Sequence, residues 1–581
     1  MIFPSENEIQ EILLKIDRKF KQIYCSIIFV GFITLLFSLA SKSEPGSAFW
    51  GGYSKERLAL IGLQIFLNTL LLIFFFYLSR KKETGLDFFW KVNVFFNNQS
   101  RYLPIRNSLF GIGLFLSFTS FYIAVLVPAF LALSMWLTYI SWVVFAFFRK
   151  KNSQPNNLNS DSPEKYFSTR QKSILLTLLI LGIAYFCIFI PINLQFSSSP
   201  QDLTGDEAVQ YPIVIKMLES QPSLRLSFYQ MFIYGEYEYG FPFYGFSALL
   251  LVPVKLIFGS NFSLHTQLNM LLLRQLVVVL PSISAAIIFT YLSTRFKKIW
   301  SSIGLFLIIL TLPGMVLHQS LFWHPDALNL LFIALTIFLL DRDDLHFGKD
   351  FYLAAVTCSL SVATRMFGLF FFVTILFLLG NAVHNKSFSM RKAVMVGGAF
   401  ILILVATFMV ANPYVYKPGE LGAAIKIFER QGAQISQGIQ EPDPEGIYQV
   451  GFSAWWPFIN RYYGAALTLA YLCLSLIVGV LSDMSKKKYY HILLTWLLVV
   501  GSYLIFFSKV KSYWYLLPLL IPLYSAGMAI PDQIEELKEK YNINPKAKLA
   551  MKNLVYIIIC GIGVLQLIIN LQWIFEKHII F

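Results

Sequence analysis

Two adjacent carboxylates follow a long apolar segment in the run Gly205-Asp206-Glu207-Ala208. Acids beside a membrane segment bind a cation, accept a structural hydrogen bond, or take a proton from a reacting hydroxyl. Neighbouring residues of a helix point about 100° apart, so Asp206 and Glu207 cannot both face one substrate atom. We therefore expect one carboxylate to do the chemistry and the other to orient or bind. The alternative for Asp206 is a simple helix N-cap, a position that favours Asp.

A second polar group lies in the run 318–327, between two apolar stretches. Asp326 stands where the second stretch begins, and a lone carboxylate buried there would be costly unless it had a partner. We therefore expect Asp326 to lie in a polar cavity or to pair with a cation. His318 and His324 could bind a metal ion together with Asp326, but this spacing is weak support, and plain hydrogen bonding is the favoured interpretation.

Three basic residues, Arg274, Arg365 and Lys511, stand at the outer ends of expected membrane spans. Positive charge in that position runs against the usual orientation bias and asks for an explanation. A phosphate group at the membrane surface would supply one, because Arg binds phosphate bidentately and Lys binds it as a point charge. Pairing with the nearby carboxylates or with lipid head groups is an equally weighted alternative.

The composition identifies the class of protein. The chain has 581 residues, of which 56% are hydrophobic and only 14% are charged, whereas a soluble domain carries about 25% charged residues. An all-α polytopic membrane protein is therefore expected. The net charge of +15 comes from Lys and Arg in short loops between apolar runs. This is the positive-inside pattern, and it argues against nucleic-acid binding.

Apolar segments that could cross a membrane recur along the whole chain, each close to the length of about 20 residues that a span needs. They are residues 22–40, 59–79, 108–127, 129–148, 173–192, 272–292, 300–317, 327–341, 351–364, 367–383, 393–411, 462–482, 489–508, 514–530 and 553–575. Basic clusters fall on one side of this threading, which is therefore expected to be the cytoplasm. These clusters are 18–21, 80–82, 149–151, 295–298, 391–392 and 486–488.

Two expected outer loops are long, at about 195–271 and 412–461. The first contains the acidic pair and also an apolar segment, 247–258. We assign this segment to an interfacial helix, because counting it as a span would place the later basic clusters outside.

A polar linker at 152–165 separates a first block of four expected spans from the rest of the chain. Three parts are therefore expected. They are an N-terminal membrane block of unknown role (1–164), a main membrane domain (165–530), and a cytoplasmic segment with a last span (531–581).

The order of these features resembles the GT-C superfamily of polytopic glycosyltransferases. The closest likeness is to the branch of protein O-mannosyltransferases and lipid A aminoarabinose transferases, and it covers about 165–530. Each shared motif is short, but their order and topology agree with that branch. The matching positions are Asp206 and Glu207 before an amphipathic helix, Phe258-Gly259 before Arg274, Asp326, Arg365 where Lys is usual, Asn412-Pro413-Tyr414, and Lys511 with Tyr513, Tyr515 and Pro518.

The resemblance implies a GT-C-like helix bundle with juxtamembrane helices in the first outer loop. It implies transfer of a single sugar, with inversion, from a polyprenyl-phosphate donor to a hydroxyl of a lipid, glycan or protein acceptor. The site would face the extracytoplasmic side of the plasma (inner) membrane. No metal cofactor is implied, although a divalent cation is left open.

The resemblance also implies roles for the matching residues. Asp206 would be the general base or would orient the acceptor, while Glu207 and Asp326 would shape the site. Other matching or neighbouring residues would bind the donor or line the cavity: Arg274, Arg365 and Lys511 would neutralise the departing phosphate, and His324, Tyr513 and Tyr515 would line the substrate cavity. One departure is clear, because the Lys-Pro-Pro stretch of the aminoarabinose transferases is replaced here by 240–244, which contains no Lys.

Two other classes of protein compete with this interpretation. A secondary transporter predicts charged residues at mid-membrane depth and a hydropathy pattern repeated between halves, and neither appears in the sequence. A lipid-linked glycan flippase or ligase could share an outer cavity lined with cations.

Overall fold

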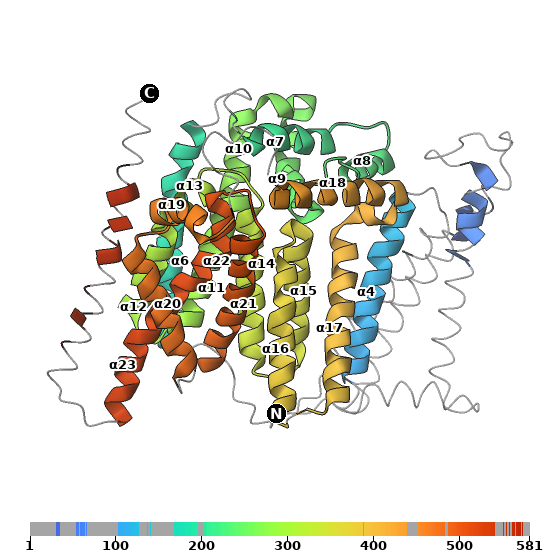
Figure 1. Cartoon of the computed structure of the whole chain (residues 1–581). Coiled ribbons are helices and arrows are strands. Elements are labelled where there is room, and N and C mark those ends of the chain that lie inside the picture. Colours follow the sequence, from blue (N-terminus) through green and yellow to red (C-terminus); the bar gives the residue numbers. More distant parts are fainter. Residues whose placement is uncertain are drawn as a thin grey trace, which may run out of the picture. The chain divides into compact units, whose positions relative to one another are not determined.

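The structure is a computed structural model of the chain (Figure 1). It describes residues 103–126, 168–195, 203, 205–386, 388–437, 450–482 and 486–540, with short stretches or single residues between 31 and 66, at 136 and 140, and between 550 and 572. Every regular element within these ranges is a helix.

The chain divides into two compact units. Unit 1 comprises residues 1–163 and 221–229, and unit 2 comprises residues 164–220 and 230–581. In unit 1, the described helix α4 (Leu103–Leu126) places the ring of Phe121 against Phe228, with 5.7 Å between centroids. All of the candidate site residues belong to unit 2.

Unit 2 is built from helices joined by short turns. With α8 (Leu224–Phe232), which belongs to both units, they are α6 (Thr169–Gln195), α7 (Asp206–Met217), α9 (Phe241–Phe258), η3 (Gly259–Leu264), α10 (Thr266–Leu273), η4 (Arg274–Val279), α11 (Leu280–Thr294), α12 (Ile299–Thr311), α13 (Pro313–Gln319), α14 (Asp326–Asp343), α15 (Lys349–Arg365), η5 (Phe367–Phe370), α16 (Phe371–His384), α17 (Met390–Ala411), η6 (Pro413–Tyr416), α18 (Pro418–Gln437), α19 (Phe452–Tyr462), α20 (Ala466–Leu481), α21 (Lys487–Phe506), η7 (Tyr513–Leu516), α22 (Leu517–Ser525), η8 (Ala526–Met528) and α23 (Ala529–Lys540).

Several of these helices are long and apolar enough to cross a membrane. Among the described residues there are seven, or up to nine if two bent pairs each count as one span. The chain is therefore an integral multi-pass membrane protein, as its composition predicts. The seven are Thr169–Leu194, Phe241–Leu264, Thr266–Thr294, Phe367–His384, Met390–Ala411, Lys487–Phe506 and Tyr513–Ile534, and the bent pairs are Ile299–Thr311 with Pro313–Gln319 and Phe452–Tyr462 with Ala466–Leu481.

Helices cover each of the spans predicted between 173 and 530. Those at 300–317 and 462–482 fall on the two bent pairs, and those at 327–341 and 351–364 form α14 and α15, which are not among the helices that meet the length and hydropathy of a span. Those predicted at 22–40, 59–79, 129–148 and 553–575 lie largely outside the described residues. The second predicted outer loop contains η6, α18 and most of α19 in its described part. The segment predicted as an interfacial helix forms α9, whose length and composition also meet those of a span.

The two ends of unit 2 can be told apart by their charged residues. α14 begins at Asp326, and Asp341 lies near its other end, about 22 Å away at 1.5 Å per residue. Arg295 contacts Asp341 with 2.7 Å between Nη1 and Oδ2, and Lys488 Nζ donates to the backbone oxygen of Asp341 at 3.2 Å. Two predicted cytoplasmic clusters, 295–298 and 486–488, therefore meet at the end of α14 opposite to Asp326.

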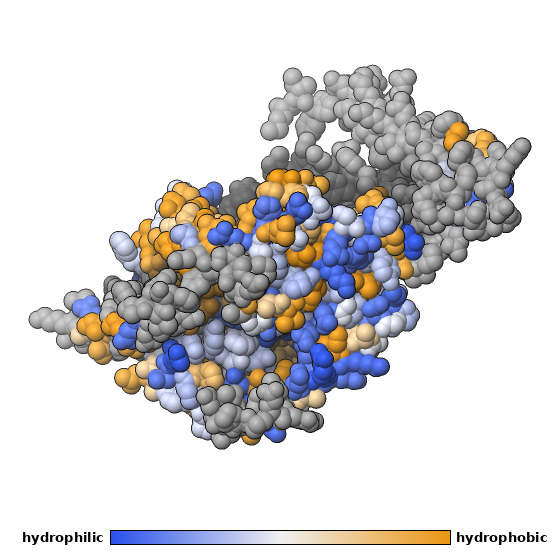
Figure 2. All heavy atoms as spheres, turned by 90° about the horizontal axis from the view of Figure 1, so that it is seen from above, coloured by the Kyte–Doolittle hydropathy of each residue, from blue (hydrophilic) through white to orange (hydrophobic). Residues whose placement is uncertain are grey.

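Transverse helices cover the Asp326 end of the bundle. Figure 1 shows α7 and α18 running across the upper end of unit 2, whereas α15, α16 and α17 stand upright. α9 contacts this layer, because Lys255 donates to the backbone oxygen of Leu218 after α7 and Ser247 accepts from Trp323 Nε1 at 3.2 Å. Seen from this end, hydrophilic and hydrophobic residues are interspersed on the described surface, and the most hydrophilic ones gather toward its right-hand side (Figure 2).

The turn between α14 and α15 is closed by Asp343. Its side chain is buried and accepts hydrogen bonds from the backbone N–H groups of Phe347 (2.7 Å) and Gly348 (2.8 Å), with a longer one from Phe351 (3.3 Å). These are unpaired donors at the start of α15, which a carboxylate satisfies while also complementing the helix dipole. The turn fixes α14 and α15 side by side, and this pairing brings Asp326 and Arg365 to the same end.

Gly240 joins the transverse layer to the end of α15. Its N–H donates to the backbone oxygen of Thr364 at 3.3 Å. A Cβ atom on Gly240 would lie 1.4 Å from the backbone oxygen of Ala363, so no other residue fits without moving the backbone. This close approach places Tyr239, the preceding residue, next to Arg365.

We predict that Gly240→Ala lowers stability by about 1–3 kcal/mol, the usual cost of forcing extra volume into a packed site. The measurement is the melting temperature of the purified protein in detergent. Gly304→Ala in α12 is the matched control, because a Cβ atom there meets nothing within 4 Å. An unchanged melting temperature in Gly240→Ala would mean that this contact is not tight in the folded protein.

Candidate functional site

Asp206 is the first residue of α7, and Gly205 precedes it as the N-cap. Gly205 has a φ of 56°, a left-handed value that glycine adopts without steric cost. Asp206 follows as the first helical residue, and its carboxylate contacts Tyr239 and His324. The alternative that Asp206 serves as the N-cap is therefore wrong, because the chain turns into the helix one residue earlier and leaves this carboxylate for other contacts.

The contacts of Asp206 come from two other segments. Tyr239 OH donates to Asp206 Oδ2 at 2.9 Å, and His324 Nε2 lies 3.2 Å from the same oxygen. The side chain is 48% exposed, so a ligand can reach it. The hydrogen bond from His324 is the main cause that holds the pKa of Asp206 below its usual value, against the opposing effect of partial burial. Asp206 is therefore ionised at neutral pH and offers oxygen lone pairs toward the surface.

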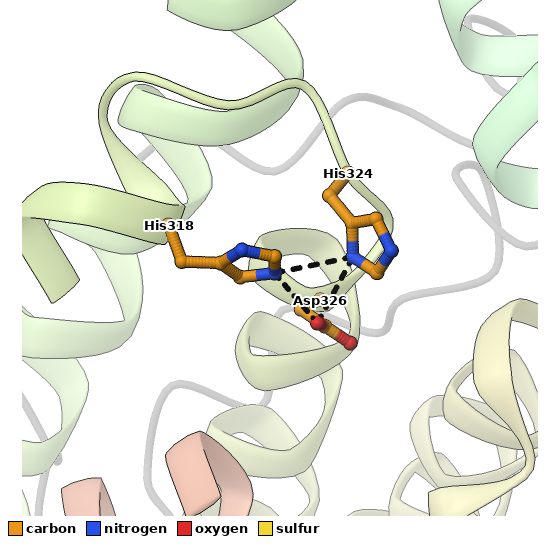
Figure 3. A group of neighbouring side chains, drawn as sticks. All are labelled: His318, His324 and Asp326. Atoms are coloured by element: carbon orange, nitrogen blue, oxygen red, sulfur yellow. Dashed lines mark hydrogen bonds and ion pairs between the residues drawn. The ribbon is translucent and has the colours of Figure 1, made fainter. Parts of the chain in front are cut away.

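His324 links this exposed carboxylate to a buried one. Its Nε2 faces Asp206, while its Nδ1 lies 2.9 Å from Asp326 Oδ2. His318, at the end of α13, places Nε2 at 2.8 Å from the same Asp326 oxygen. Figure 3 shows the three side chains of His318, His324 and Asp326 pointing toward one another from α13, the turn after it and the start of α14. His318, His324 and Asp326 are all buried.

Arg365 neutralises Asp326. Its Nη1 donates to Asp326 Oδ1 and lies 3.1 Å from His324 Nδ1. The guanidinium also lies over two aromatic rings, 5.6 Å from the centroid of Tyr239 and 5.1 Å from that of Tyr515. The prediction that Asp326 has a polar or cationic partner is confirmed. The positive charge of Arg365 and the negative charge of Asp206 thus stand on either side of one histidine.

Glu207 points away from Asp206, as adjacent helical residues must. It forms a two-bond ion pair with Arg274, with 2.9 Å from Nε to Oε1 and 2.6 Å from Nη2 to Oε2. The N–H of Trp323 donates to Glu207 Oε1 at 2.6 Å. Both charged side chains are almost fully buried, at 4% and 1% exposure. For Arg274 the structure thus shows the pairing alternative, and Glu207 ties α7 to the span that begins at Thr266.

Arg274 opens the π-helical segment η4 inside the continuous helix Thr266–Thr294. π-helical turns are uncommon and concentrate at functional positions, because the extra residue redirects the side chains around it. Here the redirected side chain is the one that meets Glu207. The π-helical geometry therefore helps to anchor α7, because it positions Arg274 for the ion pair with Glu207.

Lys511 lies in the turn before η7, and its described contacts are with backbone oxygens and an aromatic ring rather than with the carboxylates. Its Nζ donates to the backbone oxygens of Ser508 and Lys509, the latter at 3.2 Å, and lies 4.8 Å from the ring centroid of Trp455. Burial lowers the pKa of Lys511 to about 8. The amine is therefore poised to lose its charge just above neutral pH.

Aromatic residues of η7 connect the Lys511 turn to the histidines. The ring of Trp514 stacks on His318, with 5.2 Å between centroids and 11° between planes. Tyr513 contacts the same imidazole edge-on at 5.8 Å, and its backbone oxygen accepts from Tyr463 OH at 2.7 Å. The predicted cavity residues Tyr513 and Tyr515 thus both border the His318–Asp326–Arg365 group.

The structure brings most of the predicted site residues into one group and separates the rest. Asp206, His324, Asp326, Arg365 and Tyr515 lie in mutual contact through His324 and Arg365. Glu207 and Arg274 form a separate pair. Lys511 itself is not in contact with the group in the described contacts, but Tyr513 and Trp514, which follow it in the sequence, contact His318.

Sequence reasoning missed Tyr239 and Trp514. Tyr239 immediately precedes the stretch 240–244, where the Lys-Pro-Pro motif of the aminoarabinose transferases is absent. The missing motif was the only sequence signal that pointed to this region. The contact between Tyr239 and Asp206 joins two turns of the same loop, and hydrophobic periodicity does not predict contacts between turns.

No protein-family model matches the chain, and no curated protein matches it. The resemblance to GT-C glycosyltransferases therefore stays a prediction carried by the motifs.

We predict that Arg274→Met destabilises the protein strongly. Removing one partner leaves Glu207 buried and uncompensated, which costs about 3–5 kcal/mol. Arg430→Met is the matched control, because its pair with Glu238 is exposed, at 57% and 36%, and such pairs contribute only about 0–1 kcal/mol. Melting temperatures in detergent compare the two variants. Equal small losses would show that the Arg274–Glu207 pair does not anchor α7.

Proposed function

We propose that this chain is a membrane glycosyltransferase. It transfers a single sugar from a polyprenyl-phosphate-linked donor to an acceptor hydroxyl on the extracytoplasmic face, with inversion. The observation that carries the proposal is the half-exposed Asp206 carboxylate, held through His324 beside the Arg365–Asp326 pair at the end of a helix bundle. Such a pairing of one accessible base and one cation suits a reaction between a hydroxyl and a sugar phosphate.

The acceptor would be oriented by Asp206. Its ionised oxygens accept a hydrogen bond from a hydroxyl, and Tyr239 and His324 keep the carboxylate in place. The acceptor oxygen attacks the anomeric carbon, the bond from that carbon to the phosphate oxygen breaks, and the hydroxyl proton passes to Asp206. Because the pKa of Asp206 is low, Asp206 is a weak base. It contributes most after the bond to the phosphate has begun to break and the attacking hydroxyl has become acidic.

The departing polyprenyl phosphate would be stabilised by Arg365 and Lys511. Stabilising charge that develops in a site with little water is usually the largest catalytic contribution. Arg365 already lies between two tyrosine rings and a carboxylate, so its position is fixed before substrate arrives. Lys511 supplies a second charge from a separate turn. Arg274 is neutralised by Glu207 in this structure, so a direct role for it toward phosphate stays a prediction.

The arrangement of the helices supports an extracytoplasmic site. The basic clusters 295–298 and 486–488 meet at the end of α14 opposite to Asp326, and such clusters mark the cytoplasmic side. α7 and α9 lie together at the Asp326 end, where GT-C-like juxtamembrane helices would lie. The carrier lipid would then enter from the outer leaflet, with its tail along the apolar helices.

Asp206→Asn is expected to reduce transfer by about 10²–10⁴-fold, since Asn cannot take the proton. The purified protein is incubated with a panel of polyprenyl-phosphate sugars and membrane acceptors, and the products are identified by mass spectrometry. The fold should persist because the Asp206 side chain is half-exposed and Asn keeps its size. Glu238→Gln, a partly exposed acid of the same loop, is the matched control with full activity.

Retained transfer in Asp206→Asn would remove Asp206 from the chemistry. If no donor in the panel yields a product while the unaltered protein moves lipid-linked glycans across vesicles, a flippase would replace the proposed transferase.

The affinity for the donor should fall as pH rises through about 8. The pKa of Lys511 is about 8, so its amine is charged below this pH and neutral above it. Between pH 7 and pH 9 the KM for the donor should rise about tenfold, as expected for a single protonated group. Lys511→Arg should flatten this dependence, because the guanidinium stays charged. An identical pH profile in Lys511→Arg would exclude Lys511 from phosphate binding.

A further inference from the structure

Three potential metal ligands converge in the buried part of the site. His318 Nε2, His324 Nδ1 and Asp326 Oδ2 form a triangle with sides of 2.8, 2.9 and 3.2 Å. Bonds of about 2.0–2.2 Å from a tetrahedral transition metal ion to nitrogen and oxygen place neighbouring ligands about 3.3–3.6 Å apart. The triangle is therefore close to one face of such a coordination shell, and it has to widen by about 0.5 Å to hold an ion. Figure 3 shows that the three atoms point into the same space.

One side of this triangle contains no hydrogen atom. Arg365 Nη1 lies 3.1 Å from His324 Nδ1, and since guanidinium only donates, this nitrogen is an acceptor. Asp326 Oδ2 is also an acceptor, and the N–H of His318 faces it at 2.8 Å. The lone pairs of His324 Nδ1 and Asp326 Oδ2 therefore face each other at 2.9 Å. A cation beside the plane of the three atoms would bind all of them and remove this repulsion.

Two of the three atoms that point away from the triangle, His324 Nε2 and Asp326 Oδ1, have the partners that ligands of a metal usually have. A metal-binding imidazole typically donates its other N–H to a carboxylate or carbonyl, and a ligating carboxylate is hydrogen-bonded on its free oxygen. His324 Nε2 faces Asp206 Oδ2 at 3.2 Å and Tyr239 OH at 2.9 Å. Asp326 Oδ1 accepts from Arg365. Stacking on Trp514 fixes the plane of the His318 ring.

We propose that His318, His324 and Asp326 bind one divalent transition metal ion of the Zn²⁺ class. Two imidazoles and one carboxylate suit such ions, whereas Mg²⁺ and Ca²⁺ prefer oxygen ligands. On binding, the His318 proton moves to Nδ1, which has no hydrogen-bond partner in the described part of the chain. Three protein ligands leave coordination positions for water or for an oxygen of a substrate.

The ion would also change the charge of the site. With the carboxylates of Asp206 and Asp326 and the guanidinium of Arg365, a divalent ion leaves the group positively charged, and a phosphate ester would neutralise it. The metal site itself does not depend on the proposed glycosyl transfer, since binding of the ion is measured without substrate.

The test is metal binding to the full chain in detergent after treatment with a chelator. ZnSO₄ is titrated, unbound ion is removed, and bound zinc is measured by mass spectrometry. We expect one equivalent, a higher melting temperature with zinc, and a visible absorption spectrum when Co²⁺ replaces it. His318→Ala should lower the affinity roughly 100-fold and Asp206→Asn by about 10–100-fold, because the latter removes the partner of a ligand.

His346→Ala is the matched control, because this histidine is exposed at the opposite end of α14 and should leave the stoichiometry unchanged. The proposal is overturned if the unaltered chain retains no zinc and shows no Co²⁺ spectrum, or if His318→Ala retains the same equivalent with the same affinity. The zinc-dependent melting temperature and the Co²⁺ spectrum need no variant, so they decide the matter even if His318→Ala does not fold. A chain that binds zinc but transfers no sugar would support the metal site and contradict the proposed function.

Discussion

A charged group buried at the end of a membrane helix bundle must have a counter-charge nearby, because neither lipid nor packed side chains can solvate it. In this chain that requirement falls on Asp326 and Glu207. Asp326 is neutralised by Arg365, which stands at the end of the neighbouring helix, and Glu207 is neutralised by Arg274, which stands at the start of a π-helical turn. These two pairs determine where α7, α14, α15 and the span from Thr266 meet. Of the three carboxylates, Asp206 is the one without a guanidinium partner, and its side chain is half-exposed.

The two pairs have different consequences. Glu207 and Arg274 are buried, and Glu207 also accepts a hydrogen bond from the backbone N–H of Trp323. This pair therefore has a structural role, holding α7 against the span from Thr266. The Asp326–Arg365 pair borders histidines, tyrosine rings and the half-exposed Asp206. These neighbouring groups are polarisable and can respond to a change of charge, which suits a site where charge develops. Neighbouring residues in the sequence, Asp206 and Glu207, thus serve separate purposes because a helix turns them apart.

Much of this organisation could be predicted from the sequence. Long apolar runs marked the helices of unit 2, since length and hydropathy alone decide which segments suit a bilayer. The need of Asp326 for a partner followed from the same physics. The partners themselves could not be assigned, because the pairing of Arg274 with Glu207 and of Arg365 with Asp326 depends on which helices lie side by side. The role of Tyr239 could not be predicted for a related reason. Its position is set by the contact of Gly240 with the end of α15, which is distant in the sequence. The N-cap alternative for Asp206 failed by one residue, since Gly205 makes the turn that the sequence left ambiguous.

The π-helical segment at Arg274 has an implication for the length of this helix. A π-turn holds one residue more than an α-turn, so the stretch before it is rotated by about 100° relative to an uninterrupted helix. Removal of a single residue from 274–279 would restore regular winding through the membrane and yet swing the preceding helix surface away from α7. The span would keep its hydropathy and lose its register with the transverse layer. Sequence comparisons that align this segment by apolar character alone would therefore overlook the very insertion that orients it.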